Sequence, residues 1–352
     1  KKKKKIVAKR KYRYPMALER EYAKQIAGLV GGMFRTIKKD VPRMVKLVKS
    51  NQIKMDADAN TDLDEFMEYL ASVLLLREKA EPFVSRMWDK VNRYTDKEIR
   101  EIFVAVFGAS VSMRGLKAEW TQQQIIREMS EEAERYNIEL TKEEMIAIGS
   151  GILLSEILSA PEEKRKAIES ILKSRPAGAD IIASSEAQMA LTAQAKLKQL
   201  EEIWVRENLD LIGSLEAETL RKLRDELTRL IADGVPDDEI EERLIAFLNK
   251  QLEVETNRAV LIGSDQVGKL NGRLMEYWQR SAGITEYRWQ TMMDDRLRPL
   301  HADRQGLIFR WDKPPSDGHP GMAIRCRCVA DPVIDLDYYG VEPRAKTYIY
   351  VD

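Results

Sequence analysis

All histidines and cysteines of this chain lie in one short segment near its C-terminal end. His301, His319, Cys326 and Cys328 are the two histidines and two cysteines among 352 residues. Imidazole nitrogen and thiolate sulfur are the ligands that zinc prefers, and four of them complete a closed tetrahedral site. The segment therefore contains the ligand set of a structural zinc site.

The spacing of the two cysteines leaves alternatives open. One residue separates Cys326 from Cys328, whereas paired zinc ligands are usually separated by two to four residues. In an extended strand, residues i and i+2 face the same side, so both thiols can still reach one ion. Without a metal, the thiols would be partly buried structural residues and the histidines would form hydrogen bonds in loops. A disulfide between them is disfavoured because it would close a small, strained ring.

The composition indicates a folded protein with large cores. Hydrophobic residues make up 44% and charged residues 33%, so the chain has enough apolar surface for two or three domains. Lys+Arg and Asp+Glu are both 58, which excludes a globally basic nucleic-acid coat. No apolar run approaches the roughly 18 residues that a membrane span needs, and no secretory signal is visible. Two cysteines indicate a reducing compartment.

Most of the chain has helical periodicity. Apolar residues repeat at helical spacing from Pro15 onward, and Thr95 with Glu98 has the pattern of a capping box at the start of a helix. The stretch 175–185 is the best candidate for a linker, and Gly234 and Pro236 predict a break between two long helices.

After residue 283 the pattern changes to short, β-prone segments. The stretches 285–292, 307–311 and 324–333 are candidate strands. The predicted class is therefore α+β, with predominantly α-helical N-terminal and middle regions and a small, loop-rich α+β module at the C-terminal end. The expected organisation is a basic arm (1–14), a helical domain (15–175) and a third region (176–352), made of helices 185–282, the β/loop module 283–335 and a tail 336–352.

The N-terminal arm is strongly basic. Its cationic residues are Lys1, Lys2, Lys3, Lys4, Lys5, Lys9, Arg10, Lys11 and Arg13, with no acidic residue among them. Such a run is either a solvated tail or an arm that contacts nucleic acid or an acidic protein surface.

An ordered set of residues in the last third resembles a known family. Arg258 and the segment 262–265 precede Asn271-Gly272, Gly283 and Trp289. They are followed by Asp294 or Asp295, Arg298, His301, Gly306, Pro320-Gly321 and Cys326-Arg327-Cys328. Over about 204–332, this order resembles the Mu F-like phage head morphogenesis proteins, also called minor head or minor capsid proteins.

The resemblance implies a structural, low-copy component of a phage head. Members associate with the portal vertex inside the capsid, and some take part in DNA packaging or delivery. The implied partners are the portal protein, capsid or scaffolding proteins and packaged DNA, with no membrane and no small-molecule substrate. The protein would be made in the host bacterial cytoplasm, and the helical domain and the basic arm would contact the portal or DNA.

This sequence also departs from the family pattern. Gly263-Ser264-Asp265-Gln266 stands where the family has Ala-Arg-Thr-Glu, and Arg325 stands where it has Asn. His319 matches no family position, so one carboxylate could replace it as the fourth zinc ligand. The candidates are Asp294, Asp295, Asp303 and Asp317.

Two other functions compete with the structural role. One is a zinc-dependent hydrolase built on His301, a neighbouring acid and the thiol pair. The other is a free helical nucleic-acid-binding or adaptor module. Against the hydrolase, the sequence has no HExxH, Walker, GxSxG or GxGxxG motif.

Overall fold

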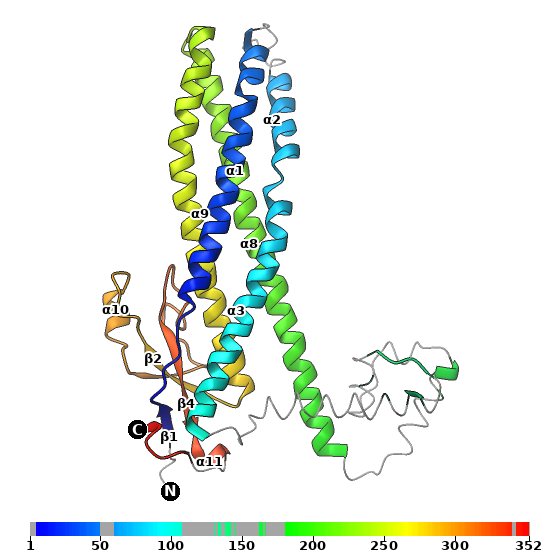
Figure 1. The fold of residues 1–352 in the computed structure, drawn as a ribbon, viewed down its shortest axis with the longest axis vertical. Helices are drawn as coiled ribbons and strands as arrows, with labels where there is room; N and C mark the ends of the chain where they lie inside the picture. Colours follow the sequence, from blue (N-terminus) through cyan, green and yellow to red (C-terminus); the bar gives the residue numbers. More distant parts are fainter. Residues whose placement is uncertain are drawn as a thin grey trace.

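The computed structural model describes residues 5–49, 60–107, 180–339 and 343–351, with isolated residues between 130 and 166. Five long helices form an elongated bundle, and a small sheet lies at one end of it (Figure 1). This arrangement confirms the predicted α+β class, in which helices predominate. Among the described helices, none is both long enough and apolar enough to cross a membrane.

The bundle consists of five helices from both halves of the sequence. They are α1 (Met16–Lys49), α2 (Asn60–Leu74), α3 (Leu76–Phe107), α8 (Asp180–Ala232) and α9 (Asp237–Ser281). The break between α8 and α9 is confirmed. Gly234 there adopts a φ of 68°, a conformation that glycine accepts without strain.

The capping box expected at Thr95 is wrong, because α3 continues through it. The Thr95 hydroxyl donates to the carbonyl oxygen of Val91 at 2.9 Å and also contacts Tyr12 and Asn271. Glu98 lies one turn further along α3 and pairs with Arg10. Thr95 and Glu98, which would form a capping box at the start of a helix, instead contact segments that are distant in the sequence.

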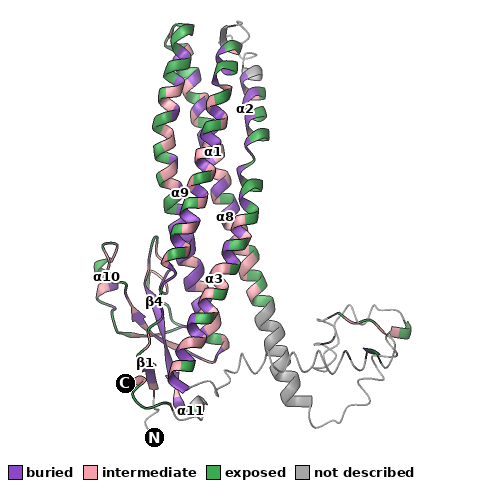
Figure 2. Cartoon of the chain, in the orientation of Figure 1, coloured by how far each residue is buried: buried purple, intermediate pink, exposed green. Residues whose placement is uncertain are grey.

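One apolar core runs through the bundle and joins the two halves of the sequence. Its buried members come from all five helices and include Tyr22, Phe34 and Trp88 in the first half, and Trp204 and Leu270 in the second. Buried residues line the inner faces of the helices in Figure 2. The core therefore does not follow the expected division at residue 175. Residues 175–179 of the expected linker lie outside the described part, and 180–185 belong to α8.

The sheet contains the three predicted strands and two others. Its order is β3-β2-β4-β1-β5, and every pair is antiparallel. Strands β2 (Glu286–Gln290) and β3 (Ile308–Arg310) lie within the predicted stretches, whereas β4 (Val329–Asp335) begins five residues later than predicted. The additional strands are β1 (Lys5–Ala8) and β5 (Tyr348–Val351) from the two ends of the chain. The short helices α10 (Pro299–Ala302) and α11 (Leu336–Tyr339) lie in the connections.

The basic N-terminal stretch is thus partly inside the fold. Strand β1 lies between β4 and β5, and Ile6, Val7 and Ala8 are buried. Ile6 and Ala8 join a second core that includes Phe103 of α3 and Trp289 of β2. The short apolar run is thus a strand of the sheet, so residues 5–8 do not form a free arm.

Candidate metal centre

The structure brings His301, Cys326 and Cys328 together, and we call these residues the His–Cys cluster. Their ligand atoms all lie within 4.8 Å of one another, and all three side chains are buried. Nδ1 of His301 is 3.5 Å from the sulfur of Cys326 and 3.5 Å from that of Cys328. Both cysteines are free thiols. The cluster therefore offers one imidazole nitrogen and two sulfurs to a common point.

Local structure explains how residues so far apart in sequence converge. His301 belongs to α10, which begins with Pro299 at a position where proline is favoured. Cys326 and Cys328 immediately precede β4. The predicted strand 324–333 is therefore wrong for residues 324–328, and the two cysteines converge from the loop before β4.

The other ring nitrogen of His301 is held by a carboxylate. Nε2 is 2.8 Å from Oδ2 of Asp317, and the other oxygen of Asp317 accepts a 2.6 Å hydrogen bond from Arg304. Burial acts to raise the pKa of Asp317, but hydrogen bonds from His301 and Arg304 outweigh it, so this pKa lies below its usual value. The guanidinium of Arg304 also lies over the Trp289 ring, 4.9 Å from its centroid. Asp317 therefore fixes the orientation of the imidazole.

The two thiols shift each other's pKa in opposite directions. A hydrogen bond from Cys328 lowers the pKa of Cys326, and backbone N–H groups of Cys328 and Gly321 act in the same direction. The same hydrogen bond raises the pKa of Cys328 above its usual value. The surroundings therefore favour ionisation of Cys326 over that of Cys328.

His319, one of the four expected ligands, is placed elsewhere. Its Nδ1 is 2.9 Å from the hydroxyl of Tyr287, and its ring packs against Trp311 with centroids 4.9 Å apart. Partial burial lowers the pKa of His319 below its usual value. It is thus part of an aromatic cluster beside β2.

The four alternative carboxylates have different surroundings. Asp317 contacts the far side of His301 and not the sulfurs, whereas Asp295 and Asp303 are exposed. Asp294 forms an ion pair with Arg327 at 2.8 Å, and both residues line a small hollow bordered by the His–Cys cluster. None of the four belongs to the group of converging ligand atoms found in the described residues.

Arg327 connects the cluster to the first helix. Its guanidinium donates to the carboxylate of Glu19 in α1 at 3.0 Å and 2.7 Å, and Arg296 donates to the same carboxylate at 3.1 Å. Burial acts to raise the pKa of Glu19, but bonds from Arg327 and Tyr14 outweigh it and hold that pKa below its usual value. No local pattern indicates this contact, because Glu19 and Arg327 are separated by 308 positions in the chain.

The loop before the cysteines is pressed closely against α9. A Cβ added to Gly272 would lie 2.4 Å from the carbonyl oxygen of Pro320, and one added to Gly268 would lie 2.9 Å from that of Cys326. Asp265 of α9 accepts a 2.9 Å hydrogen bond from the backbone N–H of Arg325. Arg325 has a φ of 57°. Asn tolerates this left-handed conformation better than most residues, which explains why Asn suits this position.

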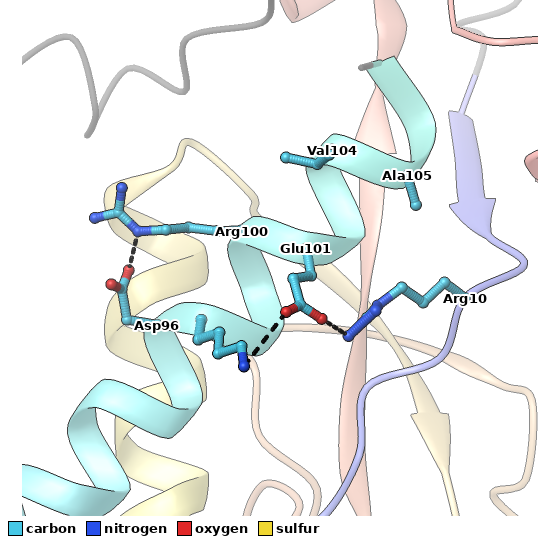
Figure 3. A pocket seen from close by; sticks show the side chains of 7 residues that line it. Arg10, Asp96, Arg100, Glu101, Val104 and Ala105 are labelled. Atoms are coloured by element: carbon cyan, nitrogen blue, oxygen red, sulfur yellow. Dashed lines mark hydrogen bonds and ion pairs between the residues drawn. The ribbon is translucent and has the colours of Figure 1, made fainter. Parts of the chain in front are cut away.

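Basic residues of the N-terminal stretch are used in two different ways. Lys5 pairs with Glu286 at 2.5 Å, and Arg10 pairs with Glu98 and Glu101 of α3. Figure 3 shows Arg10 reaching Glu101 across a shallow hollow, where Asp96 also pairs with Arg100. In contrast, Lys9, Lys11 and Arg13 are exposed. The predicted contacts by residues 1–4 lie outside the described part.

The region that contains the His–Cys cluster is similar to known proteins. Residues 221–331 match the family described as Phage Mu protein F like protein. An uncharacterized protein of Haemophilus influenzae is 35% identical over 129 residues, which cover 36% of this chain and 28% of that relative. No solved structure matches the chain.

The family match confirms the resemblance drawn from the sequence. The matched residues run from the end of α8 through α9 to the first part of β4, and they include the whole His–Cys cluster. Residues 221–331 are therefore similar to the Phage Mu protein F like family, and they make up less than half of this chain.

Proposed function

We propose that this chain is a low-copy minor head protein of a tailed bacteriophage, located inside the capsid at the portal vertex. The observation that carries the proposal is the Mu F-like match over residues 221–331. In this role the protein contacts the portal protein and capsid or scaffolding proteins. It supports head morphogenesis and DNA packaging or delivery, and it catalyses no reaction.

The shape and surface of the bundle suit such a role. The long helices extend well beyond the sheet and present long faces to solvent (Figures 1 and 2). Val254 and Leu261 of α9 lie two helical turns apart and are 46% and 40% exposed. Apolar side chains repeated on one exposed helix face are suited to protein contacts. We infer that this face of α9 is one of the surfaces that contact other head proteins.

The exposed basic residues Lys9, Lys11 and Arg13 are the part of the N-terminal stretch that supports contact with DNA or an acidic portal surface. Each phosphate contact that is lost should reduce the slope of log K against log salt by about 1. Replacement of all three by Gln should therefore flatten the salt dependence of DNA binding, whereas Lys250→Gln on α9 should not. An unchanged slope in the triple variant would exclude these residues from DNA contact.

Quantitative mass spectrometry of purified heads and virions tests the main proposal. A small number of copies per particle, in constant ratio to the portal protein, is expected. Loss of the chain from particles that lack the portal would further support location at that vertex. Absence of the chain from intact particles would contradict the proposal. Particle-free protein with a metal-dependent hydrolytic activity would instead favour the hydrolase.

A further inference from the structure

The geometry of the His–Cys cluster points to a specific ion and to specific donor atoms. We propose that Nδ1 of His301 and the sulfurs of Cys326 and Cys328 bind one zinc ion, with the fourth coordination position facing the hollow beside Asp294. Three protein ligands and one exchangeable position thus replace the closed four-ligand set that the sequence suggested. The inference rests on the geometry of these residues and is independent of the role in the phage head.

The distances within the cluster match those of a tetrahedral zinc site. A Zn–S bond of about 2.3 Å and a Zn–N bond of about 2.0 Å, at the tetrahedral angle, place nitrogen and sulfur about 3.5 Å apart. Both distances from Nδ1 of His301 to sulfur are 3.5 Å. The two nitrogen–sulfur distances therefore match those around a shared ion, and all three donor atoms lie within 4.8 Å of one another.

Asp317 sets the tautomer of His301 that can bind a metal. Because Nε2 faces the Asp317 carboxylate at 2.8 Å, Nε2 carries the proton in the neutral ring. Nδ1 then directs its lone pair toward the two sulfurs. A carboxylate that holds the distal nitrogen of a ligating histidine is a recurring feature of zinc sites.

A hydrogen-bond donor beside the sulfurs favours a thiolate form. The backbone N–H of Cys328 donates to the sulfur of Cys326 at 3.4 Å. Thiolate is the form in which cysteine binds zinc, so this donor supports the site.

No fourth side chain among the described residues completes the coordination. His319 is occupied by Tyr287 and Trp311, and Asp294 is held by Arg327. The hollow that borders the three donors is lined by Asp294 and Arg327 among others. Water or a small exchangeable ligand therefore takes the fourth position.

The test is metal analysis and cobalt titration of the full-length protein, purified under reducing conditions. The wild type should carry about one zinc per chain. Cobalt should give thiolate-to-cobalt charge-transfer absorption and the visible bands of a tetrahedral site. Cys326→Ser and Cys328→Ser should each lose zinc and the tetrahedral spectrum, while His319→Ala should keep both. Asp317→Asn should weaken zinc binding about 10- to 100-fold, and Asp303→Asn, an exposed matched control, should not change it.

Circular dichroism shows whether each variant is folded, and thiol alkylation of the wild type gives a readout that needs no variant. Zinc should protect both cysteines from alkylation, and a chelator should remove the protection. Wild-type protein that binds neither zinc nor cobalt, with alkylation unaffected by the metal, would overturn the proposal. Loss of zinc in His319→Ala, with the fold retained, would overturn the three-ligand assignment.

Discussion

Gly272→Ala should test how closely α9 supports the loop that carries the cysteines. The new Cβ would lie 2.4 Å from the carbonyl oxygen of Pro320 and 3.4 Å from Cα of Gly321. Ordinary contact begins near 3.4 Å, so the Pro320 carbonyl must move by about 1 Å. It cannot move freely, because a Cβ added to Gly321, whose φ is 90°, would lie 2.6 Å from the Gly268 carbonyl oxygen.

Two opposing terms set the expected magnitude. Overpacking against a fixed neighbour costs about 1–3 kcal/mol, and alanine in place of glycine inside a helix returns about 1 kcal/mol. Because the obstacle is backbone, we expect the upper part of the range and a net loss of about 1–2 kcal/mol. Gly28→Ala is the matched control. It lies in α1, is exposed, and its Cβ would meet nothing within 4 Å, so only the helix gain applies.

Urea unfolding followed by circular dichroism measures both variants. Gly272→Ala should shift the midpoint down and Gly28→Ala should shift it up, with slopes like that of the wild type. The displaced loop should also make Cys326 and Cys328 react faster with a thiol reagent in the folded Gly272→Ala protein. If Gly272→Ala is as stable as Gly28→Ala, the close contact between α9 and this loop is wrong.

Three further substitutions test other parts of the fold. Glu19→Gln leaves Arg327 without its buried carboxylate and should lower the free energy of unfolding by about 3 kcal/mol. Because the pKa of Glu19 is lowered in the folded state, the wild type should lose this stabilisation as pH falls below about 4.5. Acid unfolding curves of the variant should not show this loss. Ile6→Ala should lower the free energy of unfolding in urea by about 2–5 kcal/mol, because β1 is part of the core. A loss no larger than that of Lys9→Ala would show that residues 5–8 form a free arm instead. Arg325→Asn should raise the thermal midpoint, since the left-handed conformation costs most residues about 1–2 kcal/mol, and a lower midpoint would show that the arginine side chain stabilises the loop.

The features that sequence predicted correctly depend on short stretches. Strands β2 and β3 follow from short β-prone stretches, and the break at Gly234 follows from Gly234 and Pro236, which end one helix and separate it from the next. The convergence of His301 with the two cysteines was expected from ligand chemistry. In each case the signal lies within a few residues of the feature.

The features that were missed depend on contacts between distant segments. The run Ile6–Val7–Ala8 is too short to indicate a strand, and basic residues flank it on both sides. Strand β1 forms because β4 and β5, more than 300 positions away, pair with it. His319 was a chemically sound fourth ligand. The structure places it away from the His–Cys cluster, because its ring contacts Tyr287 and Trp311, and local spacing does not indicate these contacts.

The family-matched region depends on the first part of the chain for its structure. Strand β4 lies between β2 and β1, so without β1 one edge of β4 would lose its hydrogen bonds. A Cβ on Gly263 of α9 would lie 2.5 Å from Cα of Ala23, so α1 and α9 are in backbone contact. Glu19 of α1 then neutralises Arg327 between the two cysteines. The start of α1 is therefore part of the site, although it lies outside the matched residues.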